Sequence, residues 1–199
     1  MRHMAQKGYK NMAHSYDRTY LASLGFADPD KKLSEHDLAC QYLGQESNQK
    51  KLAELVEREV YKNTTGNFTI NKPSFEIPIT KGLEQYKTTI GFLDLAFYYN
   101  YKSGKKDKWS GVIVEVKISK VAMSDVIRQI KFYRQYTHEL TSKLNMYNFV
   151  LVTKFDITQE DLCMLQSANI SWIKLGKSFK EFVEMQQSDD AEMAHGEEI

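Results

Sequence analysis

The sequence predicts a mixed α/β fold in which helices and the strands of one mixed sheet succeed each other along the chain. Three β-rich segments, 75–80, 89–99 and 111–119, follow one another with no helical pattern between them. After residue 120, apolar residues at helical spacing alternate with short apolar runs that are typical of strands. The order of elements is therefore predicted to be α, β, β, β, α, β, α, β, α.

Local signals place the other elements. A helix is expected to begin at Ser47, which can act as its cap, and to end in the polar stretch 63–67. The lysine-rich segment 100–108 suits an antiparallel hairpin between the second and third strands. Ser124 is expected to cap the next helix, and a strand at 147–153, a helix from Thr158, a strand at 171–175 and a helical stretch from Ser178 follow. The inward stripe of the helix after Ser124 is predicted to comprise Val126, Ile130, Tyr133, Thr137 and Leu140.

Length and composition predict one folded domain. The chain has 199 residues, of which 42% are hydrophobic, so it can bury one substantial core. We expect an N-terminal helical extension at 1–46, the folded domain at 47–183 and an acidic, disordered tail at 184–199, because no Lys or Arg follows Lys180. The net charge is +1, so any nucleic-acid site must be local.

Cysteine usage and hydropathy indicate a cytoplasmic protein. Cys40 and Cys163 lie far apart in the sequence, which fits a reducing compartment and excludes a four-cysteine cluster within this chain. No apolar run approaches the roughly 20 residues that a membrane helix needs. The polar segment 1–7 does not resemble a signal peptide.

Charged residues on apolar strands mark the candidate site. In the segment 112–118 the even-numbered positions are Val or Ile, whereas Glu115 and Lys117 share the opposite face. Burying these charges on an interior strand is costly unless they pair or bind something. Asp94 is the one carboxylate in the apolar segment 91–97. Because neighbouring strands lie about 4.7–4.9 Å apart, Asp94 and Glu115 could share one divalent cation, with Lys117 beside it.

Asp94 in a Gly-x-x-Asp setting, followed by Glu115-Val116-Lys117 on the next strand, resembles the PD-(D/E)XK nuclease superfamily. The resemblance covers about residues 47 to 155. It implies a restriction-endonuclease-like αβββαβ core with helices on both faces of the sheet. The sequence departs from the pattern at Leu93, which stands where the superfamily name has proline, and the interval between Asp94 and Glu115 is somewhat long.

The following helix carries Gln129 and Tyr133, which are similar to the Gln-x-x-x-Tyr motif of the RecB-like branch. These two positions lie one above the other on a helix. The resemblance implies that Gln129 orients a phosphate or a metal ligand. It also implies a glutamate on the first core helix as a further metal ligand. Glu54 is preferred because it lies near the middle of that helix and adjoins the face of Leu55 and Val56, and Glu57 is a competitor. RecB-like enzymes often hold an iron–sulfur cluster, for which this chain lacks the cysteines.

The function implied by the resemblance is metal-dependent hydrolysis of phosphodiester bonds in DNA, single-stranded or duplex. Two alternatives stay open: an RNA-directed nuclease, and a nuclease-fold protein that binds nucleic acid or a protein partner without cutting. The expected cofactor is Mg²⁺ or Mn²⁺. The implied metal ligands are Asp94, Glu115, the carbonyl of Val116 and Glu54, and the implied catalytic group is Asp94, Glu115, Lys117, Gln129 and Tyr133.

Several of these features also have structural interpretations. Glu115 and Lys117 could form a simple salt bridge, Gln129 could be solvated, and Tyr133 could be a core residue. The hairpin lysines could solubilise a turn or contact phosphates; they are Lys102, Lys105, Lys106 and Lys108. The segment 176–178 suggests a phosphate-binding loop, but Ser171 stands where the first glycine of that loop belongs, so a helix start is the plainer interpretation.

Overall fold

The computed structural model of the chain describes residues 33–60, 69–81, 88–103, 106–136 and 147–184, without the side chains of 58–60, 102–103 and 106–108. Its helices are α2 (Glu35–Leu43), α3 (Glu46–Val60), α4 (Met123–Arg134) and α5 (Gln159–Ser167), followed by a helical segment at 177–184. Its strands are β1 (Thr69–Ile70), β2 (Ser74–Lys81), β3 (Thr88–Ser103), β4 (Lys106–Lys117), β5 (Tyr147–Thr153) and β6 (Ile170–Lys174). Within the described part, no helix is long and apolar enough to span a membrane.

The strands form one mixed sheet in the order β1-β3-β4-β5-β6, and β2 pairs with another part of β3. β3 and β4 make the predicted antiparallel hairpin, whose last pair is Ser103 with Lys106. β4, β5 and β6 run parallel, so all three end at the same edge of the sheet. The predicted mixed α/β fold and the αβββαβ order of its core are therefore confirmed.

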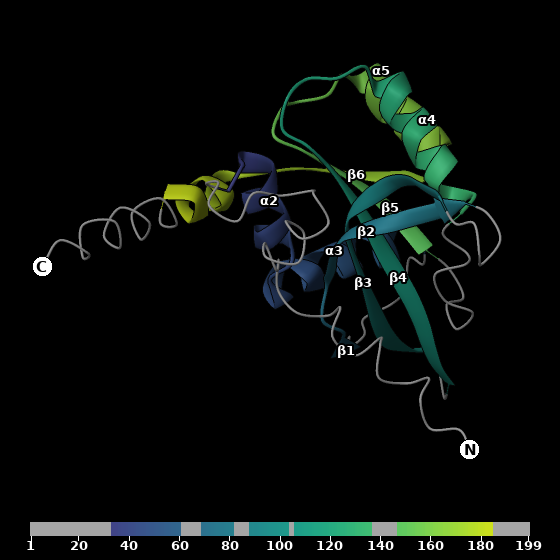
Figure 1. Cartoon of the computed structure of the whole chain (residues 1–199). Helices are drawn as coiled ribbons and strands as arrows, with labels where there is room; N and C mark the ends of the chain where they lie inside the picture. Colours follow the sequence, from purple (N-terminus) through teal and green to yellow (C-terminus); the bar gives the residue numbers. More distant parts are fainter. Residues whose placement is uncertain (1–32, 61–68, 82–87, 104–105, 137–146, 185–199) are drawn as a thin grey trace, which may run out of the picture.

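Helices cover both faces of the sheet, as predicted (Figure 1). On one face α2, α3 and the segment 177–184 pack against the even-numbered valines of β4. On the other face α4 and α5 pack against Ile113, Leu93 and the strand β5. The alternation of β4 explains this arrangement, because successive side chains of a strand point to opposite faces and both faces here are apolar.

The predicted boundary at residues 46/47 does not coincide with a packing boundary. Leu38, Ala39, Cys40 and Leu43 of α2 are buried in the same core cluster as α3 and β4. The folded core therefore begins within the segment that was predicted to be an extension. Predictions for residues 1–32, for the helix end at 63–67, for Lys105, for Thr137 and Leu140 and for the tail 185–199 lie outside the described residues.

Two predicted helix caps are wrong by two positions, and one is confirmed. α3 begins at Glu46, after Gln45, whose carbonyl accepts hydrogen bonds from the next turn, so Ser47 lies inside the helix. α4 begins at Met123 without a side-chain cap, so Ser124 is likewise inside the first turn. At α5, Thr158 forms a capping box with Asp161 as the predicted start requires.

The pleat of β2 and β3 changes face at one point. Leu93 and Leu95 are two residues apart and should share a face, yet Leu93 belongs to the α4/α5 side and Leu95 to the α2/α3 side. On β2, Phe75 and Ile77 are divided in the same way, and Glu76 between them has a positive φ of 44°. The change of face therefore falls at Glu76 and at Asp94, which lie side by side on the two strands.

Candidate active site

Asp94 lies where β3 and β4 separate. The last backbone pair of this end of the hairpin is Leu95 with Val114, so Asp94 stands one step further, opposite Glu115. Asp94 Oδ2 accepts a hydrogen bond from the backbone N–H of Val116 at 2.7 Å, which ties the carboxylate to β4. The side chain is 17% exposed, so the carboxylate is still reached by solvent. The two strands thus bring two predicted site carboxylates to one place.

Glu115 is buried on the α4/α5 face, which it shares with Ile113 as predicted. Its Oε1 atom accepts a hydrogen bond from Lys117 Nζ at 2.6 Å. Burial and the nearby Asp94 carboxylate raise the pKa of Glu115 to about 7, although Lys117 acts in the opposite direction. Glu115 is therefore a group that a second cation would stabilise in its ionised form.

Lys117 is half-buried at the end of β4. Burial lowers the pKa of Lys117, but the Glu115 carboxylate outweighs it, so the net pKa is raised and the amine stays protonated. The salt bridge that the sequence left open as a structural interpretation is therefore present. This salt bridge is compatible with a catalytic role for Lys117, because the amine contacts Glu115 and is also within electrostatic reach of Asp94.

Gln129 and Tyr133 of α4 lie next to this group. Gln129 Nε2 donates a hydrogen bond to Tyr133 Oη at 2.8 Å, which joins the two motif residues along the helix. Burial raises the pKa of Tyr133, and the carboxylates of Glu115 and Asp94 raise it further. Tyr133 is thus within electrostatic reach of both acids. It is also buried in the core, so its structural interpretation is confirmed, and its catalytic role stays a prediction.

His36 is a site residue that the sequence reasoning missed. Its Nε2 atom lies 3.3 Å from Asp94 Oδ2, the same oxygen that Val116 N–H contacts. Hydrogen bonds with Asp37 and then with Asp94 raise the pKa of His36 to about 12, so the imidazole is protonated and pairs with the carboxylate. The one sequence signal nearby is the capping box of Ser34 and Asp37, which fixes the start of α2 but says nothing of its contact with β3.

The predicted helix ligand does not join the two acids. Within the described ranges, no three side chains of His, Cys, Asp or Glu are close enough to hold a metal ion together. Glu54 is exposed on α3, because Leu52, Ala53 and Val56 turn the opposite side of that helix to the sheet. Glu57, the competitor, is buried and accepts a hydrogen bond from Tyr99 Oη at 2.5 Å. The helical residue that contacts Asp94 is instead His36.

Asp94 and Glu115 each have one carboxylate oxygen that a cation could contact. In the part of the chain that the structure describes, their hydrogen bonds and ion pairs engage Asp94 Oδ2 and Glu115 Oε1. The other oxygens, Asp94 Oδ1 and Glu115 Oε2, are the candidate ligand atoms. Mg²⁺ is commonly held by one or two carboxylates together with waters and substrate phosphate oxygens, so a third acid is not required.

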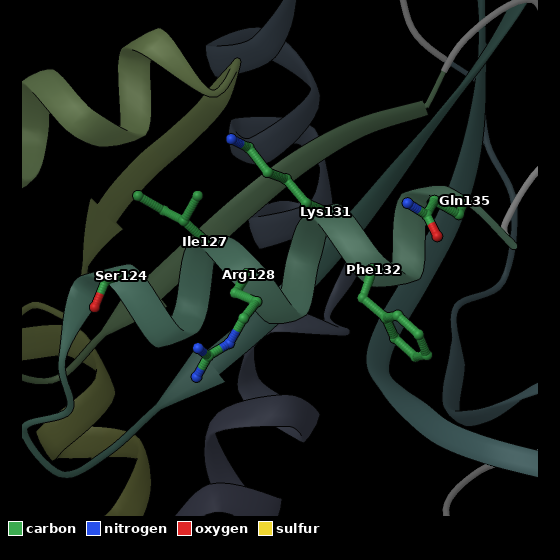
Figure 2. Close-up of a pocket in the computed structure, with 6 residues that line it drawn as sticks. All are labelled: Ser124, Ile127, Arg128, Lys131, Phe132 and Gln135. Atoms are coloured by element: carbon green, nitrogen blue, oxygen red, sulfur yellow. The ribbon is translucent and has the colours of Figure 1, made fainter.

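The basic residues of α4 contact solvent or the end of α5. Arg128 and Lys131 project from the outward side of the helix, where they line a cavity of about 400 Å³ with Phe132 (Figure 2). Arg128 is paired with Asp125 at 2.7 Å. Arg134 donates hydrogen bonds to the carbonyls that end α5 and lies over the ring of Phe149, so its role is structural.

Comparison with known proteins gives distant structural neighbours, among them two solved structures. No protein-family model and no curated protein matches the chain. The MspJI restriction endonuclease in complex with a 27-mer oligonucleotide is 13% identical, with a TM-score of 0.30 over 70% of this chain and 28% of that chain. Protein VC1899 from Vibrio cholerae is 15% identical, with a TM-score of 0.36 over 71% of this chain and 33% of that chain. This chain therefore spans about a third or less of each of these two neighbours.

Gly91 allows Tyr133 to lie close to β3, which gives a testable prediction. A Cβ atom at position 91 would lie 2.9 Å from Tyr133 Oη and from a ring carbon. We expect Gly91→Ala to lower the free energy of unfolding by about 1–3 kcal/mol, because the ring must shift within a packed core. Urea denaturation of wild type and variant measures this difference in the free energy of unfolding. Gly176→Ala is the matched control, since a Cβ there meets nothing within 4 Å; equal effects in both variants would contradict this packing argument.

Proposed function

We propose that this protein is a metal-dependent deoxyribonuclease that hydrolyses phosphodiester bonds in DNA. The observation that supports it most is the grouping of Asp94, Glu115 and Lys117 where β3 and β4 separate. Two carboxylates can hold a divalent cation, and one amine can neutralise charge on a phosphate. The same motif, with Gln129 and Tyr133 on the next helix, carries the resemblance to the RecB-like branch of the PD-(D/E)XK nucleases.

The cofactor in this proposal is Mg²⁺ or Mn²⁺, held by Asp94, Glu115 and the carbonyl of Val116. When bound, such an ion supplies Lewis acidity and lowers the pKa of a coordinated water. The pairing of two acids in a half-buried site fits this chemistry, because a cation relieves the repulsion that raises the pKa of Glu115. Glu54 is no longer part of the proposed ligand set, since it is exposed on α3.

The chain's own residues have distinct roles in this proposal. Lys117 Nζ donates to the phosphate oxygen on which negative charge develops, and it holds Glu115 in place through their hydrogen bond. His36 and the N–H of Val116 orient the carboxylate of Asp94 from two sides. Gln129 fixes the hydroxyl of Tyr133 beside both acids, so that this side of the site keeps one arrangement.

A cleavage assay tests the proposal directly. Purified protein is incubated with labelled single-stranded DNA, duplex DNA and RNA of matched sequence, each with Mg²⁺, with Mn²⁺ or with a chelator. We expect cleavage of at least one DNA form with metal and none with the chelator. Cleavage of RNA alone would assign the RNA-directed alternative, and no cleavage of any substrate would overturn the proposal.

The rival proposal is a nuclease-fold protein that binds without cutting. The 2.6 Å ion pair of Lys117 and Glu115 favours it, because this pair satisfies both charges without a metal. Calorimetric titration with Mn²⁺ separates the two proposals. A nuclease of the proposed kind binds Mn²⁺ and loses most of this affinity in Asp94→Asn, whereas a binding module has no reason to show either effect.

A further inference from the structure

Lysines are concentrated where the parallel strands β5 and β6 end. A cavity of about 370 Å³ is lined by lysine side chains together with Leu175, Gly176 and Phe179. A Cβ atom built on Gly176 would meet nothing within 4 Å, so this part of the surface is open. The lysines are Lys154, Lys174, Lys177 and Lys180, which we call the lysine track. In a chain of net charge +1, such a concentration is a local feature.

The lysine track continues the edge of the sheet on which Lys117 lies. In the parallel ladder Lys117 stands beside Thr153, and Thr153 stands beside Lys174. The backbone N–H of Lys154 donates to the carbonyl of Lys117 at 3.1 Å. The track therefore begins at the next strand after the candidate active site and leads away from it across β5 and β6.

The acidic residues that pair with the lysine track leave its side chains accessible to a polyanion. Lys154 pairs with Glu35, Lys174 with Asp156 and Lys177 with Glu181. All these side chains are at least 38% exposed, and exposed ion pairs contribute at most about 1 kcal/mol each. Lys180 is exposed and forms no ion pair with an acid in the ranges that the structure describes. A polyanion can therefore displace these partners at small cost.

We propose that one strand of the DNA crosses the lysine track, with its phosphates on Lys154, Lys174, Lys177 and Lys180. This inference rests on the proposed function, because it takes DNA as the substrate and the Asp94 site as the point of cleavage. β4, which carries Lys117, and β6, which carries Lys174, are two strand spacings apart, or roughly 10 Å. One strand of B-form DNA advances 3.4 Å per phosphate along the helix axis, so about three phosphates lie between the scissile bond and the far strand of the track.

The test replaces all four lysines of the track by glutamine and measures DNA binding in chelator, so that no cleavage is needed. Fluorescence anisotropy of a labelled 20-nucleotide DNA is recorded over a series of KCl concentrations. The slope of log K against log[KCl] is expected to become shallower by about 2 to 3, since each neutralised phosphate contributes about 0.7–0.9.

The matched control removes the same number of positive charges from lysines outside the track. Lys50, Lys51, Lys72 and Lys131 are exposed and are replaced together by glutamine; here the slope is expected to change by less than 1. Thermal denaturation checks that both variants are folded. Three results would overturn the proposal. The slope could be unchanged in the track variant, it could change equally in the control variant, or the wild-type protein could fail to bind DNA. Failure of the proposed function is distinguishable, because a protein that cuts nothing can still show the expected change of slope.

Discussion

Replacing Lys117 by alanine is expected to reduce the rate of DNA cleavage by about 100- to 1000-fold at saturating DNA, the usual effect of removing one group that stabilises developing charge. The amine lies 2.6 Å from Glu115, and Lys117 is two residues from that acid along β4, on the same face of the strand. Single-turnover cleavage with Mg²⁺ measures the effect. If the variant cuts as fast as wild type, Lys117 has no catalytic role, whatever the fold.

The control for Lys117 is an exposed lysine on another element. Lys50 lies on α3 and pairs with Glu46 in the preceding turn of the helix, so Lys50→Ala removes one charge without touching β4. Its cleavage rate is expected to stay within twofold of wild type. A comparable loss in both variants would indicate a general effect of charge and would contradict a specific role for Lys117.

The second large effect concerns the pH dependence of stability. Glu115 has a pKa of about 7 in the folded protein, raised from 4.5 by burial and by Asp94. The folded state therefore binds more protons than the unfolded state between these values, so the contribution of Glu115 to stability is complete below pH 4.5 and is lost as the pH rises to 7. Without metal, we expect this loss to reach about 3 kcal/mol.

Urea denaturation of wild type and Glu115→Gln at pH 4.5, 5.5, 6.5 and 7.5 checks this prediction. Glutamine does not titrate, so the difference between the two free energies of unfolding should change by the stated amount across the range. The interaction with Lys117 strengthens as Glu115 ionises, and it is already included in the pKa of Glu115, so it is part of the expected trend. If the free energies of unfolding of wild type and Glu115→Gln change in parallel with pH, Glu115 has an ordinary pKa and the prediction is wrong.

Mg²⁺ provides an independent check of the same residue. At pH 7.5 the ion is expected to stabilise wild type more than Glu115→Gln, since a ligand that binds the folded state raises the free energy of unfolding.

The strand pair at the centre of the site could be predicted because its information is local. Side chains alternate along a strand with a period of two residues, so Glu115 and Lys117 lie on the same face of β4 wherever β4 packs. The short hairpin makes β3 the neighbour of β4. Asp94 then falls opposite Glu115 with little freedom of register. The Gln129 and Tyr133 pair depends only on helical spacing, and the structure places both residues one turn apart on α4.

The helix contribution could not be predicted, because it depends on how α2 and α3 pack. The preference for Glu54 rested on the Leu55 and Val56 side of α3. In the structure Ala53 faces the sheet and Leu55 is only half-buried, which rotates Glu54 to the surface. A buried alanine gives little hydropathy signal, so this rotation is invisible in the sequence. His36 reaches Asp94 only through a contact between distant segments, for which no local pattern exists.

Helix starts show the same limit at a smaller scale. Ser47 and Ser124 are residues that favour caps, yet each lies inside the first turn of its helix. Thr158 was placed correctly, and there Asp161 completes a reciprocal pair of hydrogen bonds. One serine is compatible with several neighbouring positions, whereas two residues at a defined spacing determine a single one.

The change of face at Glu76 and Asp94 determines the direction from which a ligand approaches. Since Leu93 and Leu95 serve opposite helical layers, the carboxylate between them lies level with the main chain and meets the N–H of Val116. In the proposed function, a phosphate or a cation would therefore approach Asp94 where β3 and β4 separate, between the two layers of helices.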